Sequence, residues 1–225
     1  MSTAAPSTSA AGELPSHLRD VARDESSLRR FLQGLPGVDP VGVEQRAAGL
    51  ATRSIKKASK VAAIDLAISM VDLTTLEGSD TPGKVRSLAA KARRPDPLHP
   101  DTPHVAALCI YPDMAAVAVD ALTGSGVGIA SVATAFPTGR TSLAVRLADT
   151  EVAVKAGATE IDMVIDRGAF LSGHYGKVYE DIVAVKGACG GARLKVILET
   201  GELATEAIPT PLPASASTAT PTMSG

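Results

Sequence analysis

Hydrophobic and polar positions along the chain repeat in an order that alternates strand-like with helix-like segments. Short apolar runs predict strands at residues 64–73, 105–111, 128–134, 160–165 and 194–199. Apolar positions at helical spacing predict intervening helices at residues 81–92, 114–122, 142–156 and 177–189. Two further helical stretches, at residues 16–33 and 41–60, precede the first expected strand.

This alternation predicts an α/β fold built on a parallel sheet, because continuous apolar strands need helices to cover them. A barrel and a doubly wound sheet both meet that need. No G-x-G-x-x-G follows the first expected strand, so the dinucleotide-binding version lacks its phosphate cradle. The pattern therefore favours a partial (β/α)8 TIM barrel of about five βα units, with N-terminal helices and disordered ends.

Both ends of the chain differ in composition from the repeating part. Residues 1–14 are rich in Ser, Ala and Thr and are expected to form a disordered leader, followed by a helical extension at 15–60. The barrel-like repeat fills residues 61–206. Residues 207–225 contain no charged residue and four prolines, which predicts a low-complexity, disordered tail.

Composition excludes several classes of function. The formal net charge of -2 and pI near 6.1 argue against a nucleic-acid-binding surface. No apolar run is long enough to span a membrane, and the N-terminus lacks the features of a secretory signal. Two cysteines without a paired spacing fit a reducing cytoplasm, and neither they nor the four histidines have metal-site spacing.

Candidate chemistry lies where polar residues interrupt apolar strands: Asp72, Cys109, Asp162 and Lys195. Because strand side chains alternate between faces, Asp162 shares a face with Glu160, and we expect this acidic face to point into the barrel. The same parity brings Lys195, on the next strand, within reach of Asp162. Inward Asp and Lys side chains would offset one another's burial cost and could exchange protons.

Each of these residues also has a purely structural interpretation. Asp162 and Lys195 could form a buried ion pair that only fills the barrel. Asp72 could cap the loop that follows its strand. Cys109, among Ala and Leu, is typical of a small buried hydrophobe rather than a nucleophile.

Five segments together resemble one family. In order along the chain they are 71–76 (VDLTTL), 108–112 (LCIYP), 131–139 (SVATAFPTG), 158–165 (ATEIDMVI) and 194–203 (LKVILETGEL). They closely resemble the deoxyribose-phosphate aldolases, which are class I aldolases. The resemblance implies a carbon–carbon lyase that reversibly cleaves 2-deoxy-D-ribose 5-phosphate to D-glyceraldehyde 3-phosphate and acetaldehyde in deoxynucleoside catabolism.

The resemblance also implies a role for each candidate. Asp162 matches the proton-relay aspartate of the family, and Asp72, Thr74, Cys109 and Lys195 match positions that line its sugar-phosphate pocket. The family forms a Schiff base on a lysine and uses no metal or organic cofactor. The expected partner is thus a small sugar phosphate, with no nucleic acid and no membrane.

The chain departs from the family pattern after Leu203. The family's strand-six motif, with its imine-forming lysine, has no counterpart, and Lys195 matches a strand-five lysine instead. We therefore expect the chain to be inactive alone, with a tail that reflects a shifted frame or a wrong gene end. The alternatives are a non-catalytic remnant that binds a partner or sugar phosphate, and a different phosphate-using barrel enzyme. An open sheet edge would also favour homo-oligomers or aggregates.

Overall fold

The computed structural model describes residues 20–203, which form a five-stranded parallel sheet in the order β1-β2-β3-β4-β5. The strands are β1 Asp72–Thr74, β2 Ala107–Ile110, β3 Gly128–Ala133, β4 Glu160–Val164 and β5 Arg193–Ile197. Strand order follows chain order, as a barrel requires and a doubly wound sheet does not. The expected partial barrel of five βα units is confirmed.

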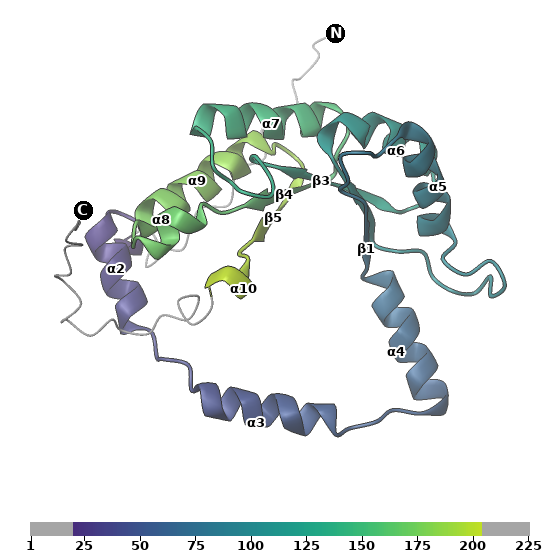
Figure 1. The fold of residues 1–225 in the computed structure, drawn as a ribbon, viewed down its shortest axis with the longest axis horizontal. Coiled ribbons are helices and arrows are strands. Elements are labelled where there is room, and N and C mark those ends of the chain that lie inside the picture. The colour runs from purple at the N-terminus through teal and green to yellow at the C-terminus, as the bar shows by residue number, and fades with distance from the viewer. Residues whose placement is uncertain (1–19, 204–225) are drawn as a thin grey trace, which may run out of the picture.

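Helices cover one face of this sheet (Figure 1). They are α5 Pro82–Arg93, the short 3-10 helix η1 Pro112–Met114, α6 Ala115–Leu122, α7 Leu143–Lys155, α8 Arg167–Leu171 and α9 Tyr175–Ala188, and α10 Thr200–Leu203 follows β5. Between sheet and helices lies an apolar core that includes Leu108, Ile161, Met163 and Val185. Removal of this apolar surface from water is what holds the helices against the sheet.

Helix starts follow local sequence signals. Thr81 accepts a hydrogen bond from the Lys84 backbone N–H at the start of α5, and Pro82 stands at its first position. Asp166 caps the short helix α8 in the same way. The capping hydrogen bonds satisfy backbone N–H groups that have no partner inside the helix.

The expected strand at residues 64–73 is wrong over most of its length. Helix α4 spans Lys57–Ser69, and β1 is limited to Asp72–Thr74. Ile64, Leu66 and Ile68 alternate with smaller or polar residues, which imitates a strand, but positions 64 and 68 also share one helical face. Four alanines within α4 have high helix propensity and favour the helix.

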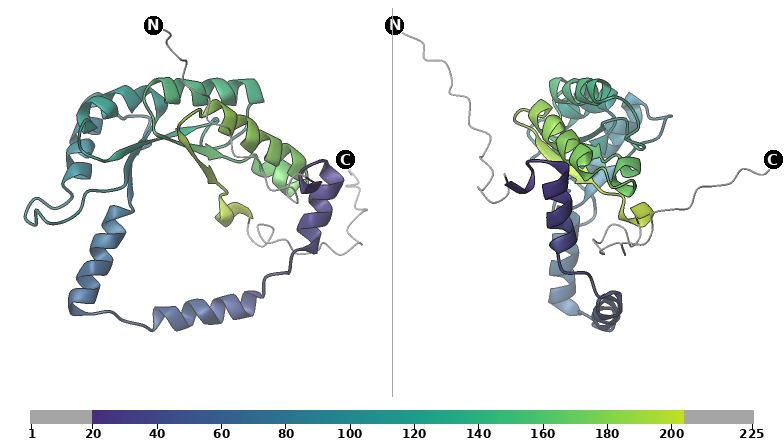
Figure 2. Two further views of the ribbon diagram at one scale, coloured as in Figure 1. Left: turned by 180° about the vertical axis from the view of Figure 1, so that it is seen from behind. Right: turned by 90° about the vertical axis from the view of Figure 1, so that its left-hand side faces the viewer.

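Helix α3, Pro40–Ala51, and α4 replace the single helical stretch expected at residues 41–60. Neither helix has a buried residue. Together they form an arch that runs from α2, Glu25–Gly34, around to the start of β1 (Figures 1 and 2). The arch lies on the side of the molecule where the sheet is open.

Helix α2 closes the arch by docking against α8 and α9. Glu25 accepts a hydrogen bond from the Gly176 backbone N–H at 2.5 Å, and Arg29 donates to the Gly173 carbonyl at 2.6 Å. Arg29 also lies over the Tyr175 ring. These contacts join segments about 145 residues apart in the sequence.

The expected leader at 1–14 and tail at 207–225 lie outside the described residues. Within residues 20–203, no helix combines the length and apolar character needed to cross a membrane.

Candidate active site

Strand β4 presents an acidic face away from the helices. Ile161 and Met163 are fully buried in the core between sheet and helices, so Asp162 points to the opposite, inner face. Asp162 pairs laterally with Lys195 of β5, as the alternation of side chains predicts. Asp162 as a whole residue is only 4% exposed, although the inner face carries no covering helix among residues 20–203.

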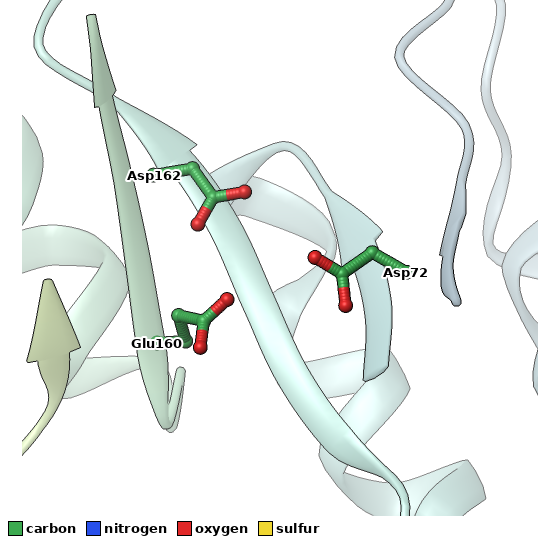
Figure 3. Close-up of side chains that lie close together, drawn as sticks. All are labelled: Asp72, Glu160 and Asp162. Carbon is green, nitrogen blue, oxygen red and sulfur yellow. The ribbon is translucent and has the colours of Figure 1, made fainter. Parts of the chain in front are cut away.

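The ammonium group of Lys195 lies among three carboxylates. Its Nζ is 2.9 Å from Asp162 Oδ2, 2.8 Å from Glu160 Oε1 and 2.5 Å from Asp72 Oδ2. Figure 3 shows the three carboxylates, from β1 and β4, pointing toward one another. The structure thus brings together three of the predicted site residues and adds Glu160.

Three carboxylates this close could also bind a cation. One oxygen from each of Asp72, Glu160 and Asp162 lies within 4.8 Å of the others. The Lys195 ammonium takes the place of such a cation, because it lies within hydrogen-bonding distance of all three. Its charge offsets part of the mutual repulsion of the acids.

The cluster shifts the pKa values of Lys195 and Asp162. Burial alone lowers the pKa of Lys195, but hydrogen bonds to Asp72, Glu160 and Asp162 outweigh burial and raise that pKa above its usual value. Lys195 is therefore a stable cation at neutral pH. Burial, helped by the nearby charges of Glu160 and Asp72, raises the pKa of Asp162 even though Lys195 opposes the shift.

The two carboxylate oxygens of Asp162 differ in their contacts. Oδ2 contacts Lys195, whereas Oδ1 is buried and has no hydrogen-bond partner among the described residues. A buried carboxylate oxygen of this kind calls for a proton, a water molecule or a ligand hydroxyl. Such an oxygen on a carboxyl with a raised pKa suits proton transfer.

Cys109 and Thr74 complete the predicted residues of the inner face. Thr74 pairs laterally with Cys109, whose Sγ lies 3.8 Å from Asp162 Oδ2. Burial, and to a smaller extent the negative charge of Asp162, raises the pKa of Cys109 to about 12. The thiol therefore stays protonated at neutral pH, which favours the interpretation as a small lining residue over a nucleophile.

A constrained loop after β3 adds residues that the sequence reasoning missed. Thr134 and Ala135 have φ angles of 65° and 60°, which are unusual for residues with a side chain. The Thr134 hydroxyl accepts a hydrogen bond from the Val164 backbone N–H, and Asp149 accepts one from Ala135. Asp149 is half-buried on α7, on the same helix face as the buried residues Arg146 and Ala153, and nothing in the sequence separates it from the surface acids.

This loop holds an aromatic group above the inner face. Phe136 packs edge to face with Tyr111, with 6.5 Å between the ring centroids. Both rings pack against a buried inner-face cluster that includes Cys109 and Val132. The acidic cluster is therefore bordered by an apolar wall.

A parallel sheet in chain order, helices on its outer face and an acid–lysine cluster on its inner face are the features of a (β/α) barrel with a candidate active site. The model of the DeoC/LacD family aldolases matches residues 63–216. The chain therefore belongs to the DeoC/LacD family of aldolases, whose members are carbon–carbon lyases. The strand-based resemblance is confirmed at the level of the family.

Individual relatives agree with this assignment. The chain is similar to the deoxyribose-phosphate aldolases of Mus musculus, 43% identical over 163 residues, and Homo sapiens, 42% identical over 165 residues. The matches cover 68% and 69% of this chain but 51% and 52% of the relatives, so the chain spans about half of their length. A crystal structure of a provisionally named deoxyribose-phosphate aldolase from Coccidioides immitis superposes with a TM-score of 0.60 at 25% identity, covering 82% of this chain and 64% of that one.

Proposed function

We propose that this chain supplies the proton-relay half of a deoxyribose-phosphate aldolase. The complete activity is the reversible cleavage of 2-deoxy-D-ribose 5-phosphate to D-glyceraldehyde 3-phosphate and acetaldehyde through a Schiff base. Two buried free cysteines fit a reducing compartment, so we place this activity in the cytoplasm.

One observation carries the proposal: the buried Asp162 carboxyl, with a raised pKa and an oxygen that has no partner among the described residues. Cleavage of a 3-hydroxy imine requires a base to take the hydroxyl proton, and the enamine that remains must be protonated at carbon. Asp162 can serve both steps, directly or through water. Lys195 holds it in position, and Asp72, Thr74 and Cys109 line the adjoining surface.

Lys195 does not suit the role of imine former. Among the strands of residues 20–203 it is the only lysine, but attack on a carbonyl requires a neutral amine. Three acidic neighbours hold Lys195 in the charged form. The imine-forming lysine must therefore come from a further βα unit that closes the barrel.

A closed chimera tests this function. Residues 20–203 would be fused to the C-terminal part of the mouse relative, and cleavage of 2-deoxy-D-ribose 5-phosphate measured. We expect activity, and we expect Asp162→Asn to lower kcat by about 10²- to 10⁴-fold, the usual contribution of a general acid–base group. Glu151→Gln, on the exposed side of α7, is the matched control and should leave kcat unchanged. An active Asp162→Asn chimera would reject the relay assignment, and an inactive parent chimera that folds would favour a non-catalytic sugar-phosphate or partner binder.

A further inference from the structure

A polar hollow lies beside α8, the short helix that follows β4. Its volume is about 320 Å³, and it shares no residue with the acid–lysine cluster of the inner face. Three segments contribute hydrogen-bond donors to its lining: Arg140 from the loop before α7, Ser172 and His174 from the turn between α8 and α9, and Lys177 from α9. Asp166 is the only acid among the described residues that line it.

The guanidinium group of Arg140 has no protein partner among residues 20–203. The structure shows neither an ion pair nor a side-chain hydrogen bond for it there, although the neighbouring Arg167 contacts both Glu199 and Glu202. Its Nη1 lies 3.2 Å from the point where a Cβ on Gly168 would stand. The missing side chain of Gly168 therefore lets Arg140 lie close to the start of α8, with its donors free for a ligand.

The acid that lines the hollow is already paired. Lys177 Nζ lies 2.9 Å from Asp166 Oδ2 and 2.9 Å from Asp181 Oδ2. The other oxygen of Asp166 accepts a hydrogen bond from the Ala169 backbone N–H. Because both oxygens of Asp166 have partners, this carboxylate does not neutralise Arg140.

A buried arginine next to this network adds further positive charge. Arg146 is 1% exposed, and its Nη2 lies 2.7 Å from Asp181 Oδ2, the same oxygen that Lys177 contacts. Its Nε and Nη1 are buried and have no acceptor among the described residues. Three cations, Arg140, Arg146 and Lys177, thus stand against the two carboxylates of Asp166 and Asp181. A surplus of positive charge and of donors favours an anionic ligand.

We propose that this hollow binds a phosphate group, either as inorganic phosphate or on a phosphomonoester. Arginine donates paired hydrogen bonds to phosphate oxygens, and lysine adds a point charge. A phosphate group also offers more acceptor oxygens than a carboxylate, which suits donors that come from three separate segments. The proposal does not rest on the proposed function, because no residue of the hollow takes part in the proton relay.

Isothermal titration calorimetry of the full chain with inorganic phosphate, in a low-salt buffer, tests the proposal. We expect binding, and an affinity about tenfold lower for Arg140→Gln, because one charge-assisted hydrogen bond is worth roughly that factor. His174→Gln changes the opposite lining segment and should also weaken binding. Arg86→Gln, at an exposed arginine of α5, is the matched control and should bind like the unchanged chain.

Two further ligands define the chemistry of the site. Acetate should bind more weakly than phosphate, since it has fewer acceptor oxygens. A titration with 2-deoxy-D-ribose 5-phosphate separates the two sources of the phosphate group. Tighter binding than that of inorganic phosphate, lost in Arg140→Gln, would identify a phosphomonoester as the ligand, whereas equal binding would show that free phosphate suffices.

Several results would overturn the proposal. Absence of binding by both phosphate compounds would do so. Equal affinities of Arg140→Gln and Arg86→Gln, with circular dichroism showing that both are folded, would mean that phosphate binds elsewhere on the surface. Acetate that binds as tightly as phosphate would reject the ligand class. None of these outcomes bears on cleavage by the closed chimera, so failure of this site and failure of the proposed function are distinguishable.

Discussion

At the residue scale, Lys195 sets the charge balance of the site, since its ammonium group contacts Asp72, Glu160 and Asp162. We expect Lys195→Met to lower the free energy of unfolding by about 2 kcal/mol. That value is below the usual cost of breaking a buried ion pair because the Lys195 side chain is partly exposed. Urea denaturation in dilute solution measures the change.

Two variants make this prediction specific. Lys155→Met removes an exposed lysine paired with Glu151 and should change stability by no more than about 0.5 kcal/mol. Adding Asp72→Asn to Lys195→Met removes one of the repelling charges and should restore part of the loss. Equal effects for Lys155→Met and Lys195→Met would contradict the account.

The raised pKa of Cys109 predicts how the stability of the fold changes at alkaline pH. The folded pKa is about 12 against an ordinary value of 9.0, so between these values the folded thiol keeps a proton that the unfolded thiol releases. Stability should therefore fall as pH rises from about 9 to about 12. The raised pKa of Lys195 acts in the same direction at still higher pH. We expect the urea midpoint to fall between pH 8 and pH 11, and to fall less in Cys109→Ala; a midpoint that rises would contradict this origin.

The alternation of side chains along a strand was enough to predict part of the site from the sequence. Alternation placed Asp162 and Lys195 on one face of adjacent strands, and the register confirms the pairing. The contact between Lys195 and Asp72 could not be predicted, because β1 and β5 are not neighbours and the curvature of the sheet brings them together. Asp149 was missed because its partner is a backbone N–H on a loop.

At the scale of elements, the loop between β3 and α7 depends on Gly139. This residue has φ +67°, and a Cβ there would lie 2.9 Å from the Ile165 carbonyl oxygen. Gly124 has a similar φ of +73° but open space around it. Gly139→Ala should therefore be more destabilising than Gly124→Ala by about 1–2 kcal/mol. Both substitutions strain the backbone at a positive φ, but only the Cβ of Gly139→Ala clashes with a neighbouring atom.

Urea denaturation of the two glycine variants measures this difference directly. Matching losses of stability would mean that the close approach of Gly139 to β4 carries no cost. That result would leave the position of Phe136, three residues earlier, without its structural explanation.

The elements themselves were predictable where the hydrophobic period was unambiguous. The strands β2 to β5 and the helices between them lie within a few residues of the expected ranges. The error at residues 64–69 arose because the alternating Ile64, Leu66 and Ile68 fit a strand, whereas the surrounding alanines favour a helix. Helices α8 and α10 were missed because five or four residues are too few to show a period.

At the scale of the whole molecule, the open side of the sheet predicts self-association. Within residues 20–203, α3 and α4 expose apolar residues, and β1 and β5 each leave one edge without a paired strand. We expect concentration-dependent oligomers in sedimentation velocity and strong binding of the dye ANS. A monomer with a sharp, cooperative melting transition and no dye binding would contradict this expectation.

The central claim is that this chain supplies the proton relay, while the imine-forming lysine belongs to the βα units that close the barrel. The most direct test treats the chain, alone and with the C-terminal part of the mouse relative, with 2-deoxy-D-ribose 5-phosphate and borohydride, and then maps adducts by peptide mass spectrometry. We predict no adduct on the chain alone and a single lysine adduct on the added polypeptide in the mixture. A sugar-derived mass increase on Lys195 would contradict the claim.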